Sequence, residues 1–224
     1  MVFDHLVGME NVRADLAPPF DVFQFALKFL QFLRLLLPEG EDPAHSRRLG
    51  WELAEKGELG PLLSFVEQRL YPSFGRRDYL HMNELTVKTV FMALLFDDLN
   101  YVMLSEPSVR TPSAQGGQRG YADLVLLLRP DARSSGLWDL VLEFKYVSLA
   151  ELGKSARELD GLDAEALSAL PPVAAAFADA REQLGRYHAG LRERYGELRL
   201  RSFAVVSLGF ERLVGLEVPS LGTP

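Results

Sequence analysis

The sequence contains no cysteine among its 224 residues. This absence excludes disulfide bonds, thiolate zinc sites and cysteine nucleophiles, and it removes any argument for secretion. The first residues contain no basic stretch followed by an apolar run, so we expect no signal peptide. The most apolar early segment, residues 20–38, is interrupted by charged and amide side chains and is too short and too polar for a membrane span. We therefore expect a cytoplasmic protein with no membrane partner.

Two common catalytic motifs are also missing. There is no Gly-x-x-x-x-Gly-Lys-Ser/Thr sequence, so this chain is not a P-loop ATPase, and there is no Gly-x-Ser-x-Gly nucleophile motif. The four histidines show no metal-ligand spacing. The net charge of −7 argues against nucleic-acid binding by the whole protein surface. It does not exclude a local basic patch that binds phosphates.

The chain has the composition of a soluble globular protein, with 48% hydrophobic and 25% charged residues. The apolar spacing predicts a helical N-terminal extension over residues 1–78, a core over 79–218 and a tail over 219–224. In the core we expect, in order, a helix, three strands, a helix and two strands: 79–98, 100–105, 121–128, 138–146, 173–195, 202–209 and 212–218. Residues 107–120 are expected to form a mobile loop, and residues 151–172 a less regular segment. This order predicts an α/β fold around a central mixed sheet.

The stretch from Trp138 to Tyr146 carries charge where apolar side chains are expected. It reads WDLVLEFKY, which is typical of a strand covered on both faces. Glu143 and Lys145 are two residues apart, so on a strand they point to the same side. Burying charge is costly unless the charge is paired or bound to a metal. The alternatives are an edge strand with one solvated face, or a structural ion pair.

A further acid, Asp123, precedes the apolar strand that begins at Leu124. Taken alone, it is more simply a solvated acid at the start of a strand. Two acids on adjacent antiparallel strands could share one oxygen-liking cation such as Mg²⁺, and the carbonyl of Phe144 could add a ligand. Lys145 beside the ion could orient an attacking water.

Three more side chains are weighed as part of this site. Glu84 lies in the helix predicted over 79–98, where spacing favours an exposed pair with Lys88 four residues later. Gln183 and Tyr187 share a face of the helix predicted over 173–195, and the simpler interpretation is a core tyrosine beside a boundary glutamine. Arginines cluster in two regions, and such clusters are usually solvated faces unless one of them steers a nucleic acid. These arginines are Arg76, Arg77, Arg110 and Arg119 in loops, and Arg192, Arg194, Arg199 and Arg201 near the end of the last helix.

Three sequence blocks together resemble the PD-(D/E)XK nuclease superfamily, in its RecB-like branch. They are Gly120-Tyr121-Ala122-Asp123, Glu143-Phe144-Lys145 and Gln183-Leu184-Gly185-Arg186-Tyr187. The stretch 83–209 is similar to the nuclease-like C-terminal domain of prokaryotic AAA-ATPase-like proteins. The chain departs from that pattern at Tyr121, where an arginine is typical, although Arg119 is close by.

The resemblance implies a restriction-endonuclease-like αβββαβ core and a role for each matched residue. Asp123 and Glu143, with the Phe144 carbonyl, would hold Mg²⁺ or Mn²⁺, and Lys145 would be the catalytic lysine. Glu84 would be an additional acid for catalysis or metal binding. Gln183, Tyr187 and Arg119 would support the site or bind substrate.

We therefore expect a Mg²⁺- or Mn²⁺-dependent phosphodiester hydrolase that acts on DNA. Two alternatives remain open: an RNA nuclease, and a catalytically inactive module of the same fold that binds a partner or nucleic acid. The resemblance also suggests an ATPase partner in trans, and a homodimer is compatible with it.

Overall fold

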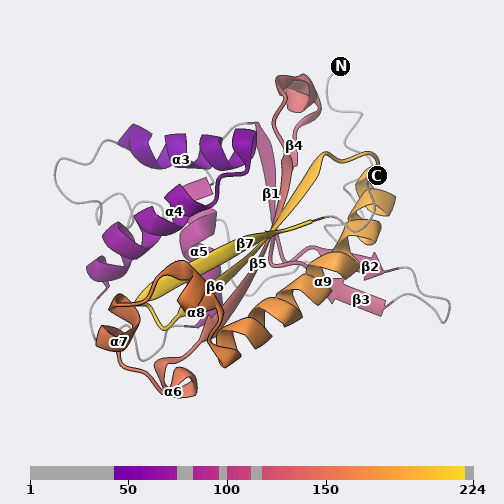
Figure 1. The fold of residues 1–224 in the computed structure, drawn as a ribbon. Helices are drawn as coiled ribbons and strands as arrows, with labels where there is room; N and C mark the ends of the chain where they lie inside the picture. Colours follow the sequence, from indigo (N-terminus) through magenta and orange to yellow (C-terminus); the bar gives the residue numbers. More distant parts are fainter. Residues whose placement is uncertain (1–42, 75–82, 96–99, 112–117, 220–224) are drawn as a thin grey trace, which may run out of the picture.

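The computed structural model describes residues 43–74, 83–95, 100–111 and 118–219 (Figure 1). Residues 1–42 of the predicted N-terminal extension and the arginines Arg76 and Arg77 lie outside the described residues. Among the described helices we find none that combines the length and the apolar character needed to cross a bilayer.

A five-stranded mixed sheet forms the centre of the molecule, in the order β1-β4-β5-β6-β7. Its strands are β1 (Tyr101–Ser105), β4 (Leu124–Leu128), β5 (Asp139–Val147), β6 (Leu200–Leu208) and β7 (Arg212–Val218). Only the central pair, β5 and β6, is parallel, and all other neighbours in this sheet are antiparallel. A parallel pair needs a crossover connection. The long helix α9 (Pro171–Tyr195) lies in that connection. The prediction of an α/β fold with a central mixed sheet is confirmed.

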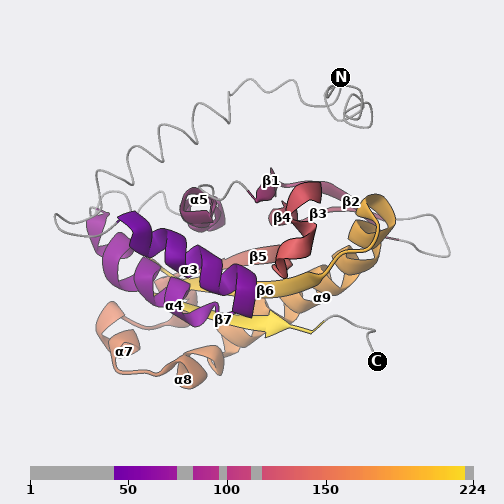
Figure 2. The same cartoon turned by 90° about the horizontal axis from the view of Figure 1, so that it is seen from above.

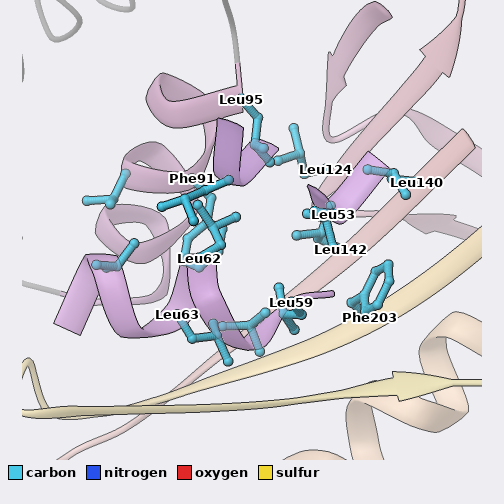
Figure 3. Packing of buried hydrophobic residues seen from close by; sticks show 14 of the residues in the cluster. Leu53, Leu59, Leu62, Leu63, Phe91, Leu95, Leu124, Leu140, Leu142 and Phe203 are labelled. Atoms are coloured by element: carbon cyan, nitrogen blue, oxygen red, sulfur yellow. The ribbon is translucent and has the colours of Figure 1, made fainter. Parts of the chain in front are cut away.

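Helices cover both faces of this sheet (Figure 2). One face packs against α3 (Pro43–Lys56), α4 (Gly60–Phe65) and α5 (Glu84–Leu95), and the other face packs against α9. Figure 3 shows the first core, in which Leu53, Leu62 and Phe91 of the helices face Leu142 and Phe203 of the strands. The α3 and α4 helices therefore share one hydrophobic core with the sheet.

Strand β5 contributes alternate residues to the two cores, as a strand buried on both faces must. Leu140, Leu142 and Phe144 enter the core beneath α5, whereas Val141 enters the core beneath α9. Glu143 and Lys145 follow Val141 in the alternation, so they point toward α9. The fold thus directs the two charged residues of this strand to one side.

Two segments show more detail than the sequence predicts. Within the helical extension predicted over 1–78, α4 is followed by a π-helical turn (Val66–Leu70) and a 3-10 turn (Tyr71–Ser73), where Pro72 cannot continue an α-helix. The less regular segment 151–172 contains α7 (Ala156–Asp160) and α8 (Ala164–Ser168), and α6 (Leu149–Leu152) comes just before them. The side chains of Ser148 and Asp163 cap α6 and α8.

The expectation of a loop over 107–120 is wrong for the described part of that segment. Two strands, β2 (Ser108–Thr111) and β3 (Gln118–Tyr121), pair there as an antiparallel ribbon. The ribbon packs on α9, because Val109 is buried and Gly120 lies against the ring of Tyr187. A helix distant in sequence therefore supplies the apolar cover that the polar ribbon lacks.

Candidate metal centre

The candidate site lies where strand β4 separates from β5. The two strands pair from Leu126↔Leu140 to Leu124↔Leu142, and the pairing then stops while β5 continues to Val147. Asp123 directly precedes the last paired residue of β4, and Glu143 directly follows the last paired residue of β5. The side of β5 that faces β4 therefore has no paired strand beyond Leu142, next to the charged residues of β5, and we call this place the gap.

Strands β1–β2 and β3–β4 form one continuous hairpin that twists at this gap. Its register is unchanged across the bend, since Glu106 N donates to the Asp123 carbonyl at 3.1 Å and Ala122 N donates to the Pro107 carbonyl at 3.3 Å. Glu106 has a φ of 51°, which is uncommon for a residue other than glycine. Val125 and Ala122 both face the α9 core although they are an odd number of positions apart. The hairpin thus reverses its faces at Asp123.

Asp123 binds directly to the backbone of β5. Its Oδ2 accepts a hydrogen bond from Phe144 N at 2.8 Å. The N–H and C=O groups of one strand residue point to the same lateral side, so the Phe144 carbonyl also faces the gap. Burial raises the pKa of Asp123, although the Phe144 hydrogen bond and Lys88 act in the opposite direction.

Glu143 is the least satisfied side chain of the site. Its side chain is 2% exposed, and its Oε1 accepts a hydrogen bond from Lys145 Nζ at 3.1 Å. Its Oε2 has no hydrogen-bond partner in the described part of the protein. Burial, and secondarily the negative charge of Asp123, raise the pKa of Glu143 to about 7. A bound cation would neutralise the negative charge on this oxygen and so lower the free-energy cost of burying it.

A second buried acid on the same strand, Asp139, has hydrogen-bond partners for both of its carboxylate oxygens. Asp139 is fully buried and accepts three hydrogen bonds, from Leu128 N at 2.8 Å, Arg133 Nη1 at 2.7 Å and Arg199 N at 3.1 Å. Both of its oxygens have partners. Asp139 therefore serves the fold, whereas Glu143 has an acceptor to spare.

Lys145 is held between two carboxylates. Its Nζ lies 3.1 Å from Glu143 Oε1 and 3.1 Å from Asp179 Oδ2 on α9. Burial alone would lower the pKa of Lys145, but the two neighbouring carboxylates outweigh burial and raise it. The ammonium group is therefore charged at neutral pH and fixed beside the gap.

A row of side chains on α9 supports this lysine. Gln183 Nε2 donates to Asp179 Oδ2 at 2.7 Å, and Tyr187 OH donates to Gln183 Oε1 at 3.5 Å. Tyr187 is buried. Asp179 was not identified from the sequence, although it lies four residues before Gln183 on the same helix face, and this spacing could have indicated it. Structurally, Gln183 and Tyr187 form one supporting row with Asp179.

Glu84 begins helix α5 and is electrostatically part of the site. Burial raises its pKa, with Lys145 lowering it and Asp123 raising it. The pair expected between Glu84 and Lys88 is wrong: Lys88 is buried and forms its ion pair with Glu106 at the hairpin bend. The Lys88–Glu106 pair joins α5 to the position where the hairpin twists.

The predicted arginines have different locations. Arg119 is exposed on β3, four residues before Asp123, and it makes no hydrogen bond or ion pair with the described site residues. Arg199 and Arg201 stack on Trp138, with their guanidinium carbons 4.4 and 5.3 Å from the ring centroid. Arg194 donates to the Ser108 carbonyl at 2.9 Å. The last three arginines therefore have structural partners.

The donor set fits a small, oxygen-liking cation. Asp123, the orphaned Oε2 of Glu143 and the Phe144 carbonyl all border the gap, and Glu84 lies close enough to interact electrostatically. Within the described ranges, no three His, Asp or Glu side chains form a ready-made ligand group. Mg²⁺ needs only one or two carboxylates, because it keeps several waters. Two carboxylates, one carbonyl and water would satisfy it.

Comparisons with known proteins leave the family open. No family model matches the chain, and no curated protein matches it. A search of solved structures finds a protein titled "Crystal structure of SSO0001", with 18% sequence identity and a TM-score of 0.33. The match covers 89% of this chain and 77% of that one.

Proposed function

We propose that this protein is a metal-dependent phosphodiester hydrolase that acts on DNA, with Mg²⁺ or Mn²⁺ as its cofactor. The observation that carries the proposal is the buried Glu143 carboxylate, whose Oε2 has no partner among the described residues, at a gap that it shares with Asp123 and Lys145. An oxygen in that state costs the fold roughly 1–3 kcal/mol. A cation would remove this cost.

Each residue has a role that follows from its position. Asp123, Glu143 and the Phe144 carbonyl would hold the ion, and Glu84 would adjust the site or contact a second ion. When bound, the ion would lower the pKa of a water molecule and offset the negative charge of a phosphate. Lys145 would place a positive charge and hydrogen-bond donors beside the water that attacks phosphorus. A compact ammonium group suits this role better than a planar guanidinium group.

Plasmid cleavage with Mg²⁺ or Mn²⁺ tests this proposal. Wild-type protein should cleave, whereas Asp123→Ala and Lys145→Ala should each lose activity by roughly 10²-fold or more. Lys154→Ala is the matched control, because it removes a lysine away from the site. Equal cleavage by all four proteins would reveal a contaminating nuclease and overturn the assignment.

One observation favours a non-catalytic interaction module as the second candidate. Lys145 already pairs with Glu143 and Asp179, as a purely structural lysine would. Binding of a metal to the native state raises its thermal midpoint. A rise with millimolar Mn²⁺ that disappears in Glu143→Gln supports the hydrolase, and the lack of any rise supports the module. RNA substrates tested beside DNA would identify the nucleic acid.

A further inference from the structure

The two faces of the β2–β3 ribbon have opposite character. One face lies against α9: Val109 is buried, Gly120 contacts Tyr187, and a Cβ at Gly190 would lie 2.1 Å from the carbonyl oxygen of Arg110. By strand alternation, the side chains of Arg119 and Tyr121 point away from Gly120 and thus away from α9. The outer face is therefore turned from the core.

The outer face concentrates positive charge in an acidic protein. Arg110 and Arg119 are directly opposite each other in the ribbon register, and both are exposed. Like charges at directly opposed positions destabilise a strand pair. No described residue forms an ion pair or hydrogen bond with either guanidinium group. An anionic ligand between the two guanidinium groups would offset their mutual repulsion, although the chain as a whole has a net charge of −7.

An exposed aromatic ring lies between these arginines and the candidate metal centre. Tyr121 is 55% exposed, and it follows Arg119 by two residues on the same side of β3. At about 3.3 Å per strand residue, Tyr121 is about 7 Å and Arg119 about 13 Å from Asp123 along the chain. Along the ribbon toward Asp123, the two arginines therefore come first, then the Tyr121 ring and then the gap.

We propose that the outer face of the β2–β3 ribbon binds a single-stranded stretch of nucleic acid and leads it to the gap at Asp123. Arg110 and Arg119 contact phosphates, and Tyr121 stacks on an unpaired base. A paired duplex keeps its bases stacked inside the helix, so the tyrosine ring selects a single strand. The inference rests on the proposed function for its substrate class, and it adds the strandedness and the residues that recognise it.

Fluorescence anisotropy with a labelled oligothymidine of about 16 nucleotides, in EDTA to prevent cleavage, tests this binding. The double variant Arg110→Gln/Arg119→Gln should bind about tenfold or more weakly, and its plot of log affinity against log salt should be shallower by about 1.4. Tyr121→Ala should bind about tenfold more weakly, and Tyr121→Phe should bind normally.

The matched control is Arg129→Gln/Arg157→Gln, which removes the same charge from exposed positions off the ribbon. It should bind like wild type. If both double variants weaken binding equally, the effect is one of net charge and the ribbon assignment fails. It also fails if all ribbon variants bind like wild type, if wild type binds no oligonucleotide, or if a duplex of the same length binds as tightly.

This result separates the ribbon from the proposed hydrolase. Cleavage by wild type together with unaffected ribbon variants would reject the ribbon and keep the hydrolase. Ribbon-dependent binding without metal-dependent cleavage would keep the ribbon and reject the hydrolase.

Discussion

Replacing Glu143 with glutamine should stabilise the metal-free protein at neutral and alkaline pH while weakening its binding of Mn²⁺. The pKa of this carboxyl rises from 4.5 to about 7 because the fold buries it. A proton is then held more tightly in the folded than in the unfolded state. The free energy of unfolding contributed by Glu143 is therefore highest below pH 4.5 and falls as the pH rises toward 7.

The size of this effect follows from the pKa difference. Each pKa unit corresponds to about 1.4 kcal/mol, so the ionised Glu143 side chain costs the metal-free fold roughly 3 kcal/mol. Glutamine cannot ionise and avoids this cost. The variant should match wild type near pH 4.5 and exceed it by roughly 3 kcal/mol near pH 8, or about 6–12 °C in thermal midpoint.

Urea unfolding in EDTA across this pH range measures the difference directly. A parallel titration with Mn²⁺ should show wild-type affinity falling up to about tenfold per pH unit below 7, because the metal must displace the Glu143 proton. Asp139→Asn is the control: the amide nitrogen of asparagine cannot accept the hydrogen bonds that the replaced carboxylate oxygen accepts, so this variant should be less stable than wild type in the same assay. A Glu143→Gln variant no more stable than wild type at pH 8 would refute the reasoning.

Three further predictions concern the surroundings of the site. Asp179→Asn removes one of the two carboxylates that hold Lys145, so cleavage should slow by roughly tenfold while the Mn²⁺-induced thermal shift persists, because Asp179 is not an expected ligand. Gly190→Ala should lower the free energy of unfolding by roughly 1–3 kcal/mol in urea, because its methyl group would lie 2.1 Å from the Arg110 carbonyl oxygen. Asp139→Ala should lower the free energy of unfolding by roughly 3 kcal/mol or more in the same assay, because the backbone N–H groups of Leu128 and Arg199 lose their acceptor and Arg133 loses its ion-pair partner.

The sequence could predict β5 and its neighbourhood because the evidence was local. An apolar run with charges two residues apart identifies both the strand and the side on which Glu143 and Lys145 lie. The hairpin through β4 then brings Asp123 beside the same strand. The structure shows Asp123 hydrogen-bonded to the backbone of Phe144 and Glu143 paired with Lys145, so all of these contacts involve β5. Their use in catalysis remains a prediction.

The remaining features depend on contacts between distant segments. The β2–β3 ribbon has little apolar character of its own and is completed by α9, so local patterns could not predict it. Lys88 has an acid at helical spacing, yet it pairs with Glu106, which only the folded hairpin bend brings near. Asp179 belongs to the site because α9 crosses beneath Lys145. In each case tertiary packing overrides a reasonable local expectation.

The contrast between Asp139 and Glu143 is the strongest argument that Glu143 and Lys145 do more than form a structural ion pair. One strand buries both acids, and the fold provides partners for both oxygens of Asp139 but leaves Oε2 of Glu143 without one among the described residues. If burial were the only requirement, β4 could have continued along β5 and an apolar residue could have replaced Glu143. Instead the hairpin turns away at Asp123, through an uncommon backbone conformation at Glu106. That turn ends the pairing of β4 with β5 at Leu142, and Glu143 Oε2 has no hydrogen-bond partner among the described residues. Backbone strain and an unsatisfied charge at the same place are the features expected where a protein sacrifices stability to bind a ligand.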